Sequence, residues 1–229
     1  MRRLISVASR NRVNLGDLDQ VEPLNDEWGY SRGIPIDRYY IEQFLGNHSA
    51  DVHGTVLSIG DDHYAQQYGG SRVVRSDILH ISDPTKGTIV ADLVNSDAFQ
   101  KNSFDCFLLI QTLQLVYDVH AAIRTTYDLL KPGGVVLATF PGITPMKDVE
   151  WNDSWYWSFT KHSAFRLFSE YFPESHISIS GYGNALAATS FLHGLSPHDI
   201  PTHKLSEYVP GYDVVLSVRA VKPSWNHLI

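Results

Sequence analysis

Short apolar runs alternate with amphipathic stretches along most of this sequence. Runs of the length of buried strands occupy 55–60, 72–79, 88–93, 104–111 and 135–140. Apolar residues at helical spacing lie between and after these runs, in 61–70, 118–134 and 160–172. Because strands that alternate with helices form mainly parallel sheets covered on both faces, this order predicts an α/β fold.

The two ends of the chain depart from this alternation. Residues 1–35 show weak periodicity and predict a loop-rich arm, and RYYIEQFLG then predicts a short helix with Asp37 as its cap. At the other end, ISISGYG predicts a sixth strand, NALAATSFLHGL a helix, and YDVVLSVRAV an antiparallel or edge strand. Pro132 and the following Gly-Gly pair are expected to end the helix that Asp118 begins.

These elements predict a Rossmann-like, doubly wound sheet of seven strands, mainly parallel with an antiparallel last strand. We expect an N-terminal arm and helix over 1–47, which form part of the active-site cover, and one domain over 48–229. The arginine-rich start, MRRLISVASRNR, resembles a transit peptide only faintly, and an arm is the preferred interpretation.

Composition narrows the classes of function. The 229 residues are 43% hydrophobic and 19% charged, with a formal net charge of −7, which argues against broad binding of nucleic acid or anionic membranes. No apolar run approaches the ~20 residues of a membrane span. Cys106 is the single cysteine, so an internal disulfide is excluded and a cytoplasmic location is expected. These features favour a small-molecule partner, and a homodimer stays open.

Candidate binding residues lie at the expected strand ends, where ligands bind in open α/β sheets. Gly60 ends the first strand and allows a ligand to approach the main chain. Asp77 follows seventeen residues later, close to the ~20 expected of an acid that binds ribose hydroxyls. Asp92 ends the third strand and suits an adenine amino group, with Ile78 and Leu93 on either side of the ring.

A family resemblance rests on several quoted segments. VLSIGDDHYAQQYGG, SDIL, ADL, NSFDCFLLIQTLQLVYD and LLKPGGVVLATFPG resemble class I S-adenosylmethionine-dependent methyltransferases, particularly the methyltransferase type 11 group. The resemblance covers about residues 55–182, and the final strand also fits. RGIPIDRYYIEQFL is similar to the segment that precedes this domain in bacterial members encoded beside glycosyltransferases.

The resemblance implies S-adenosyl-L-methionine as cofactor and S-adenosyl-L-homocysteine as product. Ile59, Gly60 and Asp61 would hold the methionine part, Asp77 the ribose, and Asp92 with Leu93 the adenine. Gln111 and Thr112 would face the reactive end. The chain departs from the family at Ser58, where an acid is usual, and at Asp62, where a second glycine is usual.

Candidate residues for the acceptor lie outside this core. His63 or His120 is the expected general base, since a hydroxyl acceptor needs one. Arg32 and Arg38 suit the cofactor carboxylate or an anionic substrate, and Tyr39 lies in the same covering segment. Trp155 and Tyr156, with Trp151 and Trp157, form an aromatic loop that suits a sugar or another flat acceptor. His193, His198 and His203 are poorly spaced for a metal, so none is expected.

Three functions stay open. The first is methyl transfer to a small oxygen nucleophile, such as a sugar, a glycan precursor or a natural product. The second is a catalytically inactive relative that binds a partner, which the changes at Ser58 and Asp62 motivate. The third is an NAD-dependent oxidoreductase, which lacks the expected GxGxxG after the first strand.

Overall fold

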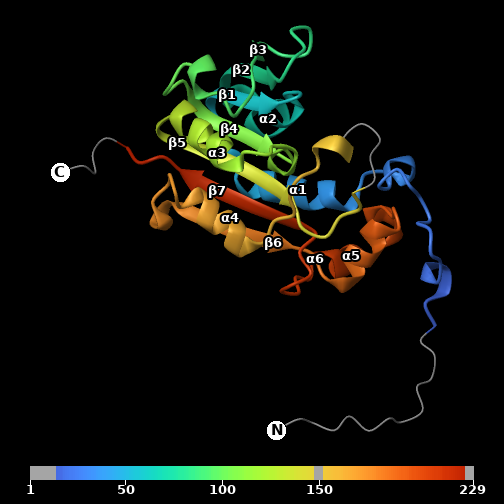
Figure 1. The fold of residues 1–229 in the computed structure, drawn as a ribbon. Coiled ribbons are helices and arrows are strands. Elements are labelled where there is room, and N and C mark those ends of the chain that lie inside the picture. Colours follow the sequence, from blue (N-terminus) through green and yellow to red (C-terminus); the bar gives the residue numbers. More distant parts are fainter. Residues whose placement is uncertain (1–13, 147–151, 225–229) are drawn as a thin grey trace.

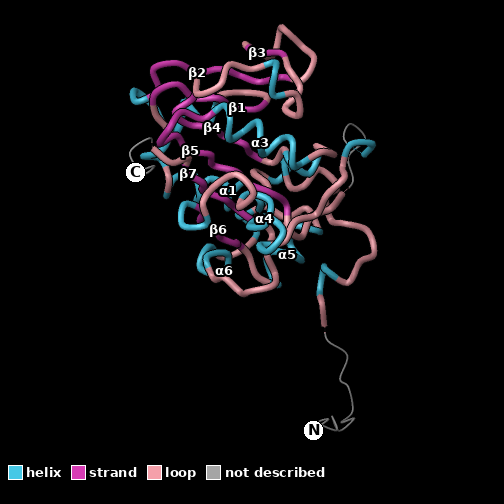
Figure 2. The backbone as a smooth tube through the Cα atoms, turned by 60° about the vertical axis from the view of Figure 1, so that its left-hand side comes forward, coloured by secondary structure: helices cyan, strands magenta, loops and turns pink. Residues whose placement is uncertain are grey.

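The computed structural model describes residues 14–146 and 152–224, and within them seven strands form one sheet. The strand order is β3-β2-β1-β4-β5-β7-β6, which the strands follow from top to bottom in Figures 1 and 2. The strands are β1 Gly54–Ile59, β2 Val73–His80, β3 Ile89–Val90, β4 Phe104–Ile110, β5 Leu130–Pro141, β6 Ile177–Tyr182 and β7 Val215–Val221. This architecture confirms the predicted fold class.

The register of the sheet brings the strand ends to one edge. The first five strands pair in parallel, and β7 pairs antiparallel with both β5 and β6. Ile59 pairs with Leu79, His80 with Val90, and Ile110 with Thr139, so the carboxyl ends of β1 to β5 lie nearly level. The strand order reverses between β1 and β4, which is where such sheets bind their ligands.

Helices cover both faces of the sheet (Figure 1). The helices are α1 Ile36–Asn47, α2 His63–Gly69, α3 Val119–Leu129, α4 Lys161–Phe168, α5 Ala185–Leu192 and α6 Thr202–Ser206. On one face, α1, α2, α5 and α6 share a core cluster that includes Ile41 and Phe191. On the other face, α3 and α4 share a second cluster that includes Ile123 and Phe168.

Local sequence explains where the helices begin. The side chains of Asp118 and Asn184 accept hydrogen bonds from backbone N–H groups in the first turns of α3 and α5. Thr160 and Ser163 form a capping box at the start of α4. These caps satisfy donors that would otherwise lack partners at a helix start.

Several expectations need correction. Pro35, and not Asp37, is the N-cap of α1, because Asp37 already lies inside the first turn. The third strand keeps only two residues, because it pairs with β2 at Leu79 and His80 alone. Pro132 and the glycines after it belong to an irregular start of β5, where the pairing with β4 shifts register. The last strand is antiparallel but lies between β5 and β6, so it is not an edge strand.

The described part of the N-terminal arm runs alongside α5 before it enters α1 (Figure 1). The backbone N–H of Asn25 donates to the carbonyl of His193, which ties the arm to the end of α5. Gly194 has a φ of 69° and so little space that a Cβ would lie 1.9 Å from the carbonyl oxygen of Asn25. Within 14–146 and 152–224, no helix is long and apolar enough to cross a membrane.

Candidate active site

In the loop after β1, the main chain at Gly60 is open enough for a ligand to approach it closely. Gly60 has a φ of 77°, and a Cβ there would meet nothing within 4 Å. Its N–H donates to the carbonyl of Leu79 across the sheet edge, which fixes the turn beside the end of β2. Open space above a left-handed glycine lets a bulky ligand reach the main chain.

Polar groups surround this glycine. The Ser58 side chain is only 3% exposed, and its Oγ has no partner among the described residues. Asp61 lies beyond Gly60 and binds the Nδ1 of His63, while Asp62 accepts a hydrogen bond from Gln66. A buried hydroxyl without a partner indicates a group that water or a ligand completes.

Asp77 lies near the end of β2, as expected, three residues before the last residue of the strand. Its side chain is 6% exposed, and Arg75 approaches it to 2.9 Å while Thr88 donates to it at 3.1 Å. The residue at the tip is His80, whose Nδ1 accepts the backbone N–H groups of Ser82 and Asp83. In the neutral His80 ring, the hydrogen therefore lies on Nε2, which can donate it.

The ends of β3 and β4 carry the other predicted residues. Asp92 follows β3, is exposed, and accepts the backbone N–H of Val94, while Leu93 is buried. Ile78 is half-buried within β2. After β4, Gln111 takes a φ of 48° and its Nε2 is buried without a partner, and Thr112 donates to the carbonyl of Ile110. The structure therefore brings Gly60, Asp92 and Gln111 to one edge.

Arg38 joins α1 to the segment after Gly60. Burial alone would lower its pKa, but the charge of Asp37 and contacts with Tyr30 and Tyr64 outweigh burial and keep the pKa above its ordinary value. Tyr64 lies in the first turn of α2 and hydrogen-bonds to Arg38, and burial raises the Tyr64 pKa. A permanent positive charge thus lies next to the loop of Gly60.

Two other residues of the covering segment point elsewhere. Arg32 makes a bidentate ion pair with Asp199, at 2.6 and 3.0 Å, and the arginine holds the pKa of that carboxyl down at about 2. The hydroxyl of Tyr39 lies 3.3 Å from that of Ser206 in α6. Both contacts fasten the arm and α1 to the C-terminal part of the chain.

The two candidate bases have different surroundings. His63 is the first residue of α2, three residues after Gly60, and Asp61 binds its Nδ1. This leaves Nε2 of His63 without a hydrogen-bonded partner among the described residues. His120 lies in the first turn of α3 and contacts Glu170 at 2.8 Å. Each histidine thus has one carboxylate that orients its ring.

The aromatic loop after β5 packs beside the segment that follows β4. The backbone N–H of Tyr156 donates to the carbonyl of Gln114 at 2.9 Å. The indole N–H of Trp157 reaches the carbonyls of Val116 and Tyr117, whereas that of Trp155 is buried without a partner. Trp151 lies outside the described residues.

One cavity lies away from the strand tips. It measures about 450 Å³ and is lined by Thr55, Phe104 and Lys131, which lie within the first two residues of β1, β4 and β5, together with Arg75 and Asp77. It therefore opens at the amino edge of the sheet, away from the strand ends beside Gly60 and Gln111. The described residues contain no cluster of histidine, cysteine or acidic side chains that could hold a metal.

Sequence reasoning missed His80 and Gln114. His80 lies where β2 ends, and only the pairing with β3 shows that the strand runs that far. Gln114 is 3% exposed and donates through Nε2 to the carbonyl of Gln111. A buried glutamine in an apolar segment, LQLV, was the available signal.

This strand order, with its switch point beside Gly60, is the fold of class I methyltransferases. Residues 44–138 match a family model described as a methyltransferase domain. Together these findings confirm the resemblance to class I S-adenosylmethionine-dependent methyltransferases of the type 11-like group.

Solved structures with this fold differ in their chemistry. A SAM-dependent methyltransferase from Archaeoglobus fulgidus matches 81% of this chain and 90% of its own, with a TM-score of 0.52 and 13% identity. Haemonchus contortus phosphoethanolamine N-methyltransferase 2, solved with phosphomonomethylethanolamine and S-adenosylhomocysteine, matches with a TM-score of 0.50, 14% identity and 82% of this chain. This chain spans 58% of that enzyme's length.

A cyclase shares the same architecture. The [4+2]-cyclase SpnF matches 81% of this chain and 80% of its own, with a TM-score of 0.51 and 13% identity. No curated protein sequence matches the chain. At such identities the likeness shows the fold, and function must be argued from the site.

Proposed function

We propose that this chain is an S-adenosylmethionine-dependent methyltransferase that acts on an oxygen atom of a small acceptor. The open, left-handed Gly60 at the end of β1, next to the switch point, is the observation that carries the proposal. Solved neighbours that contain S-adenosylmethionine or S-adenosylhomocysteine support the choice of cofactor.

The residues at the strand tips fit this cofactor. Ile59, Gly60 and Asp61 would hold the methionine part, with Arg38 opposite its carboxylate. The partnerless Ser58 hydroxyl suits the ammonium group as an acceptor. Asp92 and Leu93 would hold the adenine, with Ile78 beside the ring.

The ribose needs a partner at the tip of β2. We assign this role to His80, whose Nε2–H is free to donate while Nδ1 serves the backbone. Asp77 remains the alternative, although its carboxylate already serves Arg75 and Thr88. Gln111 and Thr112 would line the reactive end.

The bound cofactor supplies an electrophilic methyl group on a sulfonium, and S-adenosylhomocysteine is the product. The protein's own task is to align the acceptor oxygen and to remove its proton. Asp61 orients His63 so that Nε2 accepts that proton, and His120 is the second candidate. Trp155 and Tyr156 would contact the acceptor, with Arg32 and Tyr39 holding the covering arm in place.

Two other functions predict different behaviour. A catalytically inactive relative is motivated by Ser58 and Asp62, which replace an acid and a glycine of the family pattern. An NAD-dependent oxidoreductase would need a glycine-rich loop where the chain has GDDH.

Calorimetric titration with S-adenosylmethionine, S-adenosylhomocysteine and NAD separates these functions. Micromolar binding of the first two compounds, without NAD binding, is the expected result. Binding of NAD alone would favour the oxidoreductase, and no binding of any of the three would favour the inactive relative.

A further inference from the structure

Three buried polar atoms without partners lie in the segments that follow β4 and β5. They are Nε2 of Gln111, Oε1 of Gln114 and Nε1 of Trp155, and none has a hydrogen-bond partner in the described part of the chain. Buried amide and indole groups without partners are costly, and native proteins rarely keep them except where a ligand or water completes them.

Hydrogen bonds join Gln111 to Gln114 and Gln114 to Tyr156, the neighbour of Trp155, and the three residues with unpartnered atoms are here called the glutamine–indole cluster. Nε2 of Gln114 donates to the carbonyl of Gln111 at 2.9 Å, which also fixes which end of the Gln114 amide is left free. The backbone N–H of Tyr156, next to Trp155, donates to the carbonyl of Gln114 at 2.9 Å. The cluster thus joins the tip of β4 to the loop after β5.

The unsatisfied atoms define a hydrogen-bonding pattern of two donors and one acceptor. The Gln111 amide and the Trp155 indole can donate, and the Gln114 carbonyl oxygen can accept. A hydroxyl group both accepts and donates, so it matches the pattern, whereas an ammonium group only donates. All three groups of the cluster are neutral, so it offers no charge to an ionic ligand.

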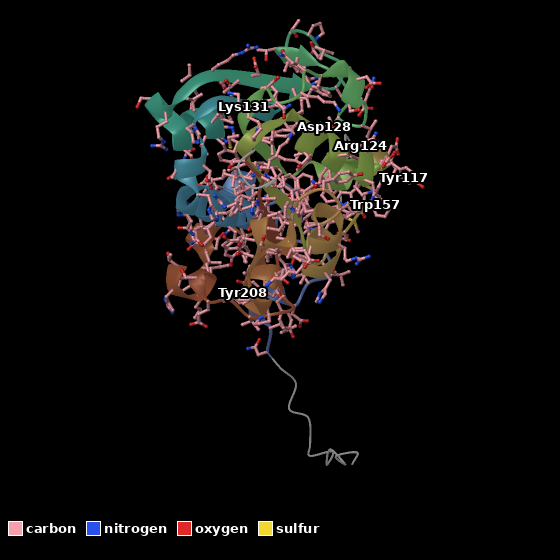
Figure 3. The ribbon with its side chains drawn as sticks, turned by 90° about the vertical axis from the view of Figure 1, so that its left-hand side faces the viewer. Tyr117, Arg124, Asp128, Lys131, Trp157 and Tyr208 are labelled. Carbon is pink, nitrogen blue, oxygen red and sulfur yellow. The ribbon has the colours of Figure 1, made fainter. Side chains whose placement is uncertain are left out.

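An aromatic rim adjoins the cluster. Tyr117, Tyr156 and Trp157 are 72%, 48% and 37% exposed, and Tyr117 lies 5.3 Å from Tyr156 and 6.0 Å from Trp157 between ring centroids. Figure 3 shows Tyr117 and Trp157 next to each other at one rim of the molecule. The indole N–H of Trp157 is bonded internally, so its ring is held while part of its surface stays open.

We infer that the glutamine–indole cluster and its aromatic rim bind a neutral, hydroxyl-rich ring compound, namely a sugar unit. Hydroxyl groups pair with the free amide and indole atoms, and the apolar face of the sugar ring lies on the exposed aromatic rings. This inference rests on the proposed function in that the sugar is the methyl acceptor. Binding of the sugar is nevertheless measurable without any methyl transfer.

The first test uses saturation-transfer NMR on the full chain with S-adenosylhomocysteine present. The probes are the methyl α-pyranosides of glucose, galactose and mannose, with ethanolamine and phenol as the competing chemistries. At least one pyranoside should receive saturation from the protein, and ethanolamine should not. Binding of ethanolamine or phenol without any pyranoside would overturn the inference.

Two variants locate the bound sugar. Gln114→Met keeps a similar length but removes the whole side-chain amide, both the free Oε1 and the Nε2 that donates to Gln111. Trp155→Phe removes the indole N–H but keeps an aromatic ring. Each should weaken pyranoside binding about tenfold, the loss expected for one hydrogen bond. Gln100→Met is the matched control, because Gln100 lines the cavity at the opposite edge and should leave binding unchanged.

The melting temperature of Gln114→Met separates recognition of the sugar from a purely structural role of Gln114. Gln114→Met removes a buried oxygen that has no partner, but it also removes the hydrogen bond from Nε2 to the carbonyl of Gln111. Because these two effects oppose each other, the melting temperature should change little. A lower melting temperature with unchanged pyranoside binding would make Gln114 structural and refute the inference. If the wild-type protein does not bind S-adenosylhomocysteine, the proposed function is contradicted. If it binds S-adenosylhomocysteine but none of the pyranosides, this inference alone is contradicted.

Discussion

The substitution Gly60→Ala tests the cofactor contact directly. Gly60 has a φ of 77° with nothing within 4 Å of where a Cβ would lie, so alanine meets no protein atom there. The cost to the free protein is therefore backbone strain alone, of order 1–3 kcal/mol. In a domain of this size the melting temperature should fall by about 2–4 °C for each kcal/mol.

Cofactor binding should suffer an additional loss. If the ligand packs on the main chain of Gly60, the new methyl group occupies the space of its nearest atoms. Overpacking of this kind costs about 1–3 kcal/mol, which is about 5- to 150-fold in Kd. Calorimetric titration with S-adenosylhomocysteine measures this loss, and thermal unfolding measures the strain.

Gly70→Ala is the matched control. Gly70 also has a positive φ, of 54°, and nothing within 4 Å of a Cβ, but it lies beyond the other end of α2. Its substitution should cost stability in the same way and leave the Kd unchanged. If Gly60→Ala binds S-adenosylhomocysteine as tightly as Gly70→Ala does, the contact at Gly60 is refuted.

The remaining predictions concern Asp77, the arm and the base. Asp77→Ala should lower the free energy of unfolding by about 1–3 kcal/mol, because it removes hydrogen bonds to Arg75 and Thr88. It should leave the affinity for S-adenosylhomocysteine unchanged, and a weaker affinity in calorimetry would mean that Asp77 binds the ribose. Arg32→Ala should lower the melting temperature at neutral pH, because the hydrogen bond from Arg32 is the largest of the interactions that lower the pKa of Asp199 to about 2. A carboxyl with a depressed pKa stabilises the fold above its ordinary pKa, so the difference between wild type and Arg32→Ala should shrink as the pH falls from about 4 towards 2, and a constant difference across that range would contradict the assignment. His63→Asn should slow methyl transfer to a sugar acceptor by about 10²–10⁴-fold with cofactor affinity unchanged, and a rate equal to wild type would favour His120.

Elements with a strong local signal were predictable from the sequence. The apolar run 104–111 forms a strand, and Asp118 caps the helix that it was expected to begin. These features depend on residues only a few positions apart in the sequence. The strand is marked by its run of buried apolar residues, and the helix start is marked by one side-chain hydrogen bond. The mainly parallel sheet with helices on both faces also followed from the alternation of strands with helices.

Features set by pairing between distant segments were not predictable in the same way. The third strand is shortened because β2 offers it only Leu79 and His80, and the same pairing shows that β2 runs past Asp77. The ion pair of Arg32 joins residues 167 positions apart. Neither partner carries a local signal for such a contact, so an arginine expected to face the substrate instead fastens the arm.

The family match covers only part of the carboxyl edge of the sheet. The family match ends at residue 138, within β5, and so includes Gly60, Asp92 and Gln111 but stops before Trp155. Because one fold serves a methyltransferase and a cyclase alike, the shared part of the chain does not fix the reaction. Under the proposed function, we expect the choice of acceptor to depend on residues 155–157 after β5 and on their contact with Gln114. Substitutions at the tips of β1 to β4 should therefore change cofactor affinity, and substitutions in 155–157 should change which acceptor binds.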